Sequence, residues 1–167
     1  MQKLRGFTLF ELVFVVCLIA VLATFALSRF GDFQEAAEEI AVEQDVAALR
    51  LALMMRSSDF LGAHQWQDLD ALPSQNPFSL LEAKPANYGG LFAGVENPGF
   101  WYYAQQEREL RYRARRGSSL GAGAVDGVLR YRVVGMNSLG QAAKGAGVAY
   151  VTLKPAGAYT WAGRELR

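Results

Sequence analysis

The chain has 167 residues, 51% of them hydrophobic, a formal net charge of +1 and one cysteine, Cys17. This length suggests one domain with an appendage. The near-neutral charge gives no indication of a nucleic-acid partner, and a single cysteine excludes both an intramolecular disulfide and a cysteine-ligated metal cluster.

The charges are unevenly distributed along the chain. Residues 31–59 contain seven acidic residues and two arginines, whereas residues 100–167 contain eleven basic and four acidic residues. Two interpretations remain open. The acidic and basic segments either complement each other between neighbouring copies or form two solvated faces.

The chain opens with an apolar run, Phe7 to Leu27, whose one charged residue is Glu11. At about 1.5 Å per residue this run is long enough to cross a membrane core of about 30 Å. Lys3 and Arg5 precede it, so the positive-inside rule predicts a cytoplasmic N-terminus with the bulk of the chain outside. A secretory signal peptide and a plain signal anchor are the alternatives.

The residues Gly6-Phe7-Thr8-Leu9-Phe10-Glu11-Leu12-Val13 resemble the N-terminus of type IV pilins and type II secretion pseudopilins. The resemblance implies that residues 1–6 are a leader, which a prepilin peptidase removes after Gly6. Phe7 then becomes the N-methylated first residue, and Glu11 falls at the fifth position of the mature chain. The family places such subunits in the bacterial inner membrane, as a single pass with a periplasmic C-terminal domain.

The resemblance also gives Glu11 a role in assembly. A carboxylate inside a membrane run needs a partner, and the family implies the terminal amine of Phe7 in a neighbouring subunit. At an effective dielectric of about 20, unit charges about 4 Å apart attract by about 4 kcal/mol, and desolvation offsets part of this. The pair is therefore best interpreted as a device that sets register. Implied partners are other pilin subunits, the peptidase, an inner-membrane platform and a cytoplasmic ATPase.

Residues 7–29 are expected to form the transmembrane half of one long helix and residues 30–57 its amphipathic half. No proline precedes Pro73, and apolar residues recur near a 3.6 period at Ala36, Ile40, Val42, Val46, Leu49 and Leu53. We expect one face to be covered by a sheet and the outer side to be acidic. Ser28 and Gly31 could allow a bend, although relatives often carry a proline near 28 and a glycine near 20, where this chain has Ser28 and Ala20.

Residues 58–99 lose this period and contain the turn signals Pro73, Asn76-Pro77, Pro85, Gly89-Gly90 and Asn97-Pro98. We expect a variable connecting loop, which the pilin resemblance makes a plausible contact region. His64 lies near Asp68 and Asp70, but this spacing is common by chance, and no metal site or cofactor is expected there. The tail offers Asp126 and Glu165 alone, too few acids for the calcium loop of major pseudopilins.

Residues 100–167 switch to a period of two and predict an antiparallel sheet of about four strands. The expected strands are 100–104, 110–115, 128–134 and 148–153, with a short fifth at 158–161. Leu110, Tyr112 and Ala114, with Leu129, Tyr131 and Val133, should face inward, and Arg111, Arg113, Arg115, Arg130 and Arg132 outward. The fold class is thus α+β, a long N-terminal helix packed on a C-terminal sheet.

No pattern indicates catalysis. Gly117-Ser118-Ser119-Leu120-Gly121 fits the letters of a nucleophile elbow, but no helical pattern follows it and the one histidine lies upstream. The outward arginines could bind a polyanion or form local ion pairs with Glu107 and Glu109. We therefore expect a non-enzymatic filament subunit of a type II secretion system or a pilus. The alternative is a monomeric membrane-anchored binding protein that uses the arginine face or the 57–99 loop.

Overall fold

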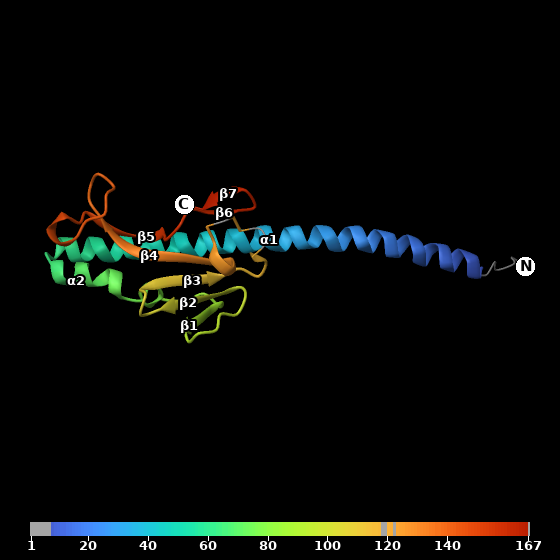
Figure 1. Ribbon diagram of the computed structural model, residues 1–167, viewed down its shortest axis with the longest axis horizontal. Helices are drawn as coiled ribbons and strands as arrows, with labels where there is room; N and C mark the ends of the chain where they lie inside the picture. The colour runs from blue at the N-terminus through green and yellow to red at the C-terminus, as the bar shows by residue number, and fades with distance from the viewer. Residues whose placement is uncertain (1–7, 118–119, 122, 167) are drawn as a thin grey trace, which may run out of the picture. The chain divides into compact units, whose positions relative to one another are not determined.

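The computed structural model describes residues 8–117, 120–121 and 123–166, and it divides the chain into two compact units, Met1–Ala37 and Glu38–Arg167. The long helix α1 (Leu9–Gly62) begins in the first unit and continues into the second. The second unit also holds helix α2 (Trp66–Ala71) and the strands β1 (Tyr88–Leu91), β2 (Phe100–Ala104), β3 (Glu109–Arg113), β4 (Val128–Met136), β5 (Tyr150–Pro155), β6 (Tyr159–Trp161) and β7 (Arg164–Leu166) (Figure 1).

Helix α1 begins at a side-chain cap. The backbone N–H of Glu11 donates to Thr8 Oγ1 at 3.2 Å, and the N–H of Leu12 donates to the Thr8 carbonyl at 3.1 Å. Thr8 is therefore the N-cap, the position that threonine favours because its hydroxyl satisfies an otherwise free helical N–H. The backbone remains helical through Ser28 and Gly31, where the sequence allowed a bend.

The helix ends at Gly62 rather than near residue 57. The Ser57 and Ser58 hydroxyls both donate to the Met54 carbonyl at 2.9 Å, which lets two serines remain inside the helix. Phe60 then adds a buried aromatic ring to the core. His64, at φ 57°, takes the left-handed position after the helix, and the Gln65 N–H donates to the Phe60 carbonyl at 2.9 Å, which completes a Schellman motif.

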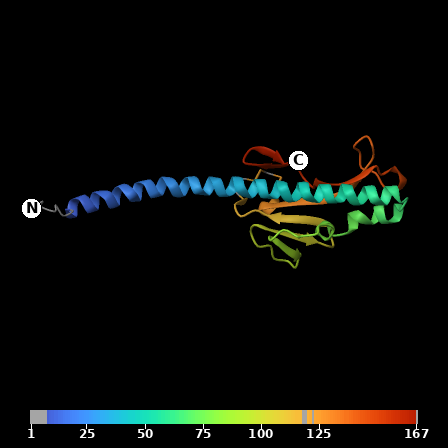
Figure 2. The ribbon, with the colours of Figure 1, turned by 180° about the vertical axis from the view of Figure 1, so that it is seen from behind.

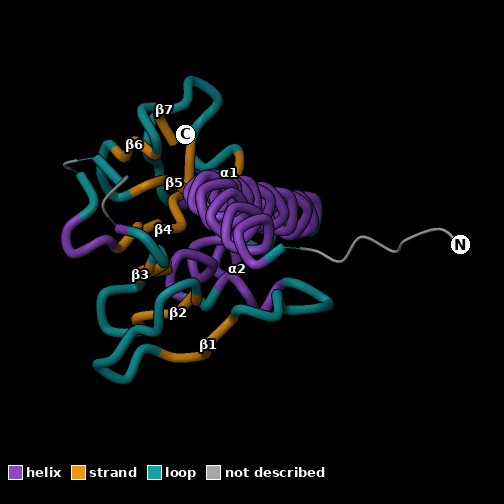
Figure 3. The backbone as a smooth tube through the Cα atoms, turned by 90° about the vertical axis from the view of Figure 1, so that its right-hand side faces the viewer, coloured by secondary structure: helices purple, strands orange, loops and turns teal. Residues whose placement is uncertain are grey.

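The main sheet has five strands in the order β1-β2-β3-β4-β5, where the sequence predicted about four. The pairs β2–β3, β3–β4 and β4–β5 are antiparallel, with Tyr112 opposite Leu129 and Val133 opposite Leu153. Figure 3 shows the five strands following one another in order beside α1. The expected α+β layout, a long helix packed on a mostly antiparallel sheet, is confirmed.

Two parts of the C-terminal region differ from the expected arrangement. Strand β1 lies inside the segment expected to be a loop and pairs in parallel with β2. It contains Gly89 and Gly90, which in the sequence indicate a turn and not part of a strand. A Cβ at Gly89 would overlap the Tyr102 ring, so only glycine fits there. Residues 159–161 pair with β7 in a separate two-stranded sheet and do not extend the main one.

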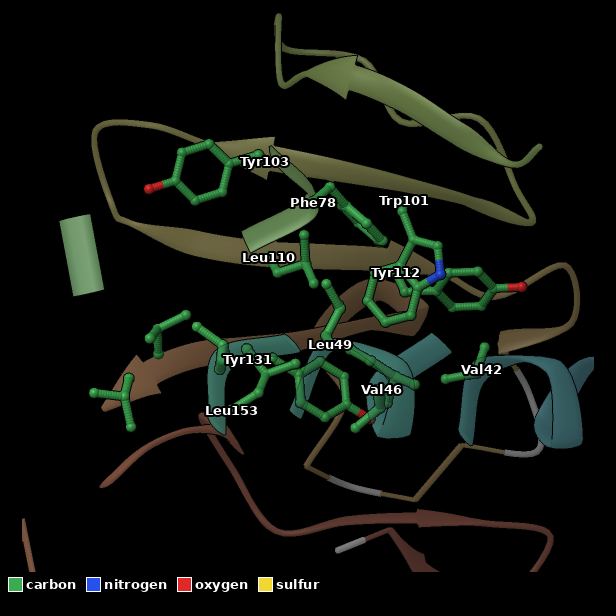
Figure 4. Packing of buried hydrophobic residues seen from close by; sticks show 14 of the residues in the cluster. Val42, Val46, Leu49, Phe78, Trp101, Tyr103, Leu110, Tyr112, Tyr131 and Leu153 are labelled. Carbon is green, nitrogen blue, oxygen red and sulfur yellow. The ribbon is translucent and has the colours of Figure 1, made fainter. Parts of the chain in front are cut away.

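The core lies between α1 and the inner face of the sheet. Figure 4 shows Val42, Val46 and Leu49 of the helix directed toward aromatic side chains of the strands. Trp101, fully buried, lies at the centre, with ring centroids 4.8 Å from Tyr112 and 5.8 Å from Phe78. Phe78 comes from the connecting segment, where the Asn76 side chain accepts the Phe78 N–H at 3.1 Å and caps a short 3₁₀ helix (Pro77–Leu80).

The outer side of α1 is not acidic as expected. Its exposed face in the second unit carries large apolar residues that are 50–61% exposed, namely Ile40, Leu51, Met54 and Met55. At about 100° per residue these lie opposite the buried Val42, Val46, Leu49 and Leu53. Glu38, Glu39 and Asp45 lie on the flanks of the helix instead, where they bond to residues of the strands.

Candidate assembly site

Of the residues expected to act in processing (Gly6 and Phe7) and in assembly (Glu11 and Phe7), the structure describes Glu11. Gly6 and Phe7, expected to flank the cleavage point, lie outside the described residues. Glu11 lies in the first turn of α1 and is exposed. A carboxylate there is favoured by the positive end of the helix dipole, independently of any second subunit. Thr8 with Glu11 three residues later is the S/T-x-x-E pattern of a capping box, and this pattern could have predicted the start of the helix.

The helix that follows Glu11 is apolar and exposed. An 18-residue window of α1 has a mean hydropathy of 2.7, and none of that window is buried. Phe10, Phe14 and Phe25 are 63–81% exposed. A surface this apolar is long enough to span a membrane and is available to lipid or to other helices.

Acidic residues of the helix bind this chain's own sheet. The Arg164 Nη2 lies 2.8 Å from Glu39 Oε2, and the Glu39 side chain is 2% exposed. Glu38 Oε1 accepts the Tyr112 hydroxyl at 2.7 Å and the Arg115 N–H at 2.9 Å. The interpretation that the acidic segment 31–59 binds the basic segment of a neighbouring copy therefore does not hold for these carboxylates, because their partners are intramolecular.

Asp45 of helix α1 and Tyr112 of strand β3 have pKa values that burial shifts. Burial raises the pKa of the Asp45 carboxyl, and the hydrogen bond from Trp101 Nε1 at 2.8 Å opposes this in part. Burial and the Glu38 carboxylate raise the pKa of Tyr112, which therefore stays a hydrogen-bond donor at neutral pH. Both groups connect the helix to the sheet at its most buried point.

The outward arginines form local ion pairs. Glu109, 7% exposed, accepts from Arg132 Nε at 2.9 Å and lies within 4.0 Å of Arg111 and Arg130. Arg111 also lies 3.8 Å from Glu96, and its guanidinium stacks 4.6 Å from the Phe92 ring centre. This face was expected either to bind a polyanion or to form local ion pairs. Arg111, Arg130 and Arg132 form local ion pairs.

A cleft with a volume of about 560 Å³ lies at the C-terminal end of strand β4, and residues of α2 contribute to its lining. Its floor is apolar, with Leu69, Val133, Val148 and Val151, and Arg108 and Lys144 lie at its rim. We call it the β4 cleft. Figures 1 and 2 show α2 beside the C-terminal end of α1 at this end of the second unit.

Of the other residues considered for chemistry, Asp70 lines the β4 cleft and His64 does not. His64 ends the helix, and Asp70 Oδ1 accepts the Gly145 N–H at 2.8 Å. No group of three or more histidine, cysteine or acidic side chains suited to a metal ion occurs among the described residues. Ser118 and Ser119 of the glycine-rich stretch lie outside the described part of the chain.

Comparison with known proteins gives one informative match. No family model matches the chain, and no solved structure matches it. A probable minor fimbrial protein of Dichelobacter nodosus is 42% identical to it over 53 residues, which are 32% of this chain and 33% of that protein. The chain thus matches about a third of the relative's length. This partial similarity supports a relationship to the pilin family.

Proposed function

We propose that the chain is a non-enzymatic structural subunit of a type IV filament, either a minor pilin or a pseudopilin. The observation that carries the proposal is an exposed apolar helix with a carboxylate, Glu11, in its first turn. The partial similarity to a probable minor fimbrial protein supports it.

In this proposal a prepilin peptidase cuts after Gly6 and Phe7 is N-methylated. The hydrophobic helix stays attached to the second unit, which stands in the periplasm while α1 crosses the inner membrane. A platform protein and an ATPase then move the subunit into the filament, where contacts with other helices replace contacts with lipid.

In this proposal Glu11 sets the axial position at which a subunit joins the filament. The amine of Phe7 in a neighbouring subunit neutralises a charge that lipid penalises, so a subunit at the wrong axial step leaves both charges unpaired. Because the same residue lies at the third helical position, its glutamine variant keeps the capping geometry and loses the charge.

The test therefore compares Glu11→Gln with Glu11→Ala in cells that assemble the filament. We expect both variants to be cleaved and both to be absent from sheared filaments, because the charge is what the neighbour recognises. Asp32→Ala, an exposed acid on the same helix, is the matched control and should assemble normally. Filament incorporation of Glu11→Gln at the level of the unmodified chain would contradict the pairing.

The second candidate is a monomeric membrane-anchored binding protein, which the β4 cleft favours because residues of the 57–99 segment line it. The two candidates differ in their need for Gly6. Gly6→Val should block processing and assembly of a filament subunit, whereas an anchored binding protein needs no glycine there.

A further inference from the structure

We propose that, in the assembled filament, Val125 and Asp126 of one copy dock into the β4 cleft of the next copy. The inference rests on the proposed function and names the contact between second units that the filament would use. Its evidence is a projecting apolar–acidic turn at one end of β4 and an apolar cleft with a cationic rim at the other end.

The projecting turn is the 3₁₀ segment η4 (Val125–Gly127), directly before β4. Val125 is 55% exposed, and Asp126 beside it is exposed as well. Among the described residues, no hydrogen bond or ion pair involves the Asp126 carboxylate. An apolar side chain next to an unused acid is the chemistry that an apolar pocket with a basic rim recognises.

The backbone holds this turn in place before any partner arrives. Asp126 and Gly127 have φ values of 57° and 71°, and the Ala114 N–H donates to the Gly127 carbonyl at 3.0 Å. A Cβ at Gly127 would lie 3.1 Å from the Gly117 Cα, so two backbones touch here. A fixed turn loses little conformational freedom on docking.

The cleft offers complementary groups. Val133, Val148 and Val151 line its floor and are 1–7% exposed, so a valine side chain would enter apolar surroundings. Arg108 and Lys144 lie at the rim and are exposed, and in the described part of the chain neither forms an ion pair. Asp70 is the acid at the rim and accepts the Gly145 N–H, and because Arg108 and Lys144 outnumber this carboxylate the rim keeps a net positive charge.

The turn η4 and the β4 cleft lie at opposite ends of one strand, so a contact between them joins copies head-to-tail. Strand β4 has 9 residues, so at about 3.3 Å per residue turn and cleft are separated by about 30 Å. A contact between two different surfaces of identical subunits does not close on itself unless the rotation happens to close, and it generates a helical array. This is the geometry that a filament subunit needs.

The test is cross-linking between differently tagged copies co-expressed in cells that assemble the filament. One copy carries Val125→Cys and the other Ala142→Cys at the cleft, both with Cys17→Ser to remove the single native cysteine. We expect a mixed-tag dimer in sheared filaments. Leu139→Cys, 81% exposed and just beyond the end of β4 that is opposite η4, replaces Val125→Cys in the matched control and should give no such dimer.

A charge exchange tests the recognition itself. Asp126→Lys should lower the dimer yield roughly two- to fivefold, the effect of one exposed ion pair, and adding Arg108→Glu to the cleft copy should restore it. Filaments without the Val125–Ala142 dimer, an equal yield with Leu139→Cys, or cross-linking of the cleft to a different protein would overturn this contact and leave the filament proposal intact. Absence of the unmodified chain from filaments would overturn both.

Discussion

Glu39 and Arg164 form an ion pair whose two ends differ in exposure. The Glu39 side chain is 2% exposed, whereas the Arg164 side chain is 67% exposed. Arg164→Ala therefore leaves an unpaired charge in the core and should lower the free energy of unfolding by about 3 kcal/mol or more. Chemical denaturation of the full chain in detergent measures this.

Removing the carboxylate of Glu39 should reduce stability less than removing Arg164, because the Arg164 guanidinium is exposed and water can solvate it when its partner is lost. Glu39→Gln keeps the shape of the side chain and removes the buried charge, so we expect it to cost less than Arg164→Ala. In the double variant Glu39→Gln should recover much of the loss. An equal cost for the two single variants would show that the pair is not controlled by the buried carboxylate.

Asp45 gives the molecule a pH dependence of definite sign. Its folded pKa lies above the unfolded value because burial disfavours the charged form. The folded state therefore binds the proton more tightly, and Asp45 lowers stability as pH rises from the unfolded pKa through the folded one. Asp45→Asn should remove this component, so its stability relative to the unmodified chain should rise as the pH increases above about 4, the ordinary pKa of an aspartate. Thermal unfolding across that range tests it, and a relative stability that falls instead would contradict the assignment.

The buried indole allows a second test at the same position. Trp101 is fully buried, and its N–H donates to Asp45. Asp45→Ala leaves that donor without its acceptor and should cost about 1–3 kcal/mol of unfolding free energy, whereas the asparagine variant keeps an acceptor oxygen. Denaturation of the two variants side by side measures the difference, and equal stabilities would show that water replaces the carboxylate.

At the scale of elements, the end of α1 depends on a histidine in a left-handed conformation. His64 has φ 57°, a region that glycine enters without the cost of a Cβ. His64→Gly should raise the free energy of unfolding by up to about 1 kcal/mol, and His64→Val should lower it because a β-branched residue is strained there. Thermal unfolding checks both, and a loss of stability in the glycine variant would mean that the imidazole itself contributes.

The long helix and the arginine-bearing strands could be predicted because their periods are strong. Leu110 and Tyr112 alternate with Arg111 along β3, and the structure buries the first two. Strand β1 could not be predicted, since Gly89 and Gly90 have low strand propensity and only the packing of Tyr102 requires a glycine. The helix was expected to end at residue 57, where the apolar period is lost, but the Ser57 and Ser58 hydroxyls bond within the helix, which continues to Gly62.

At the scale of the whole molecule, the segregated charges left open whether the acidic and basic segments pair between copies or stay solvated. The Glu39–Arg164 ion pair shows that they also complement each other within one chain. Composition could not distinguish the two cases, because the three-dimensional register of helix and sheet decides which carboxylates are buried. The N-terminal motif is a local pattern, and the position of Glu11 in the first turn of α1 could be predicted from it.

If the chain is a filament subunit of this kind, Phe7 is the first residue of the processed protein. The intact mass and N-terminal sequence of the protein isolated from membranes test this first. We expect a chain that begins at N-methylated Phe7. A chain that begins near Arg29 would show an ordinary signal peptide, and one that retains Met1 would show a simple anchor; either result would rule out processing after Gly6.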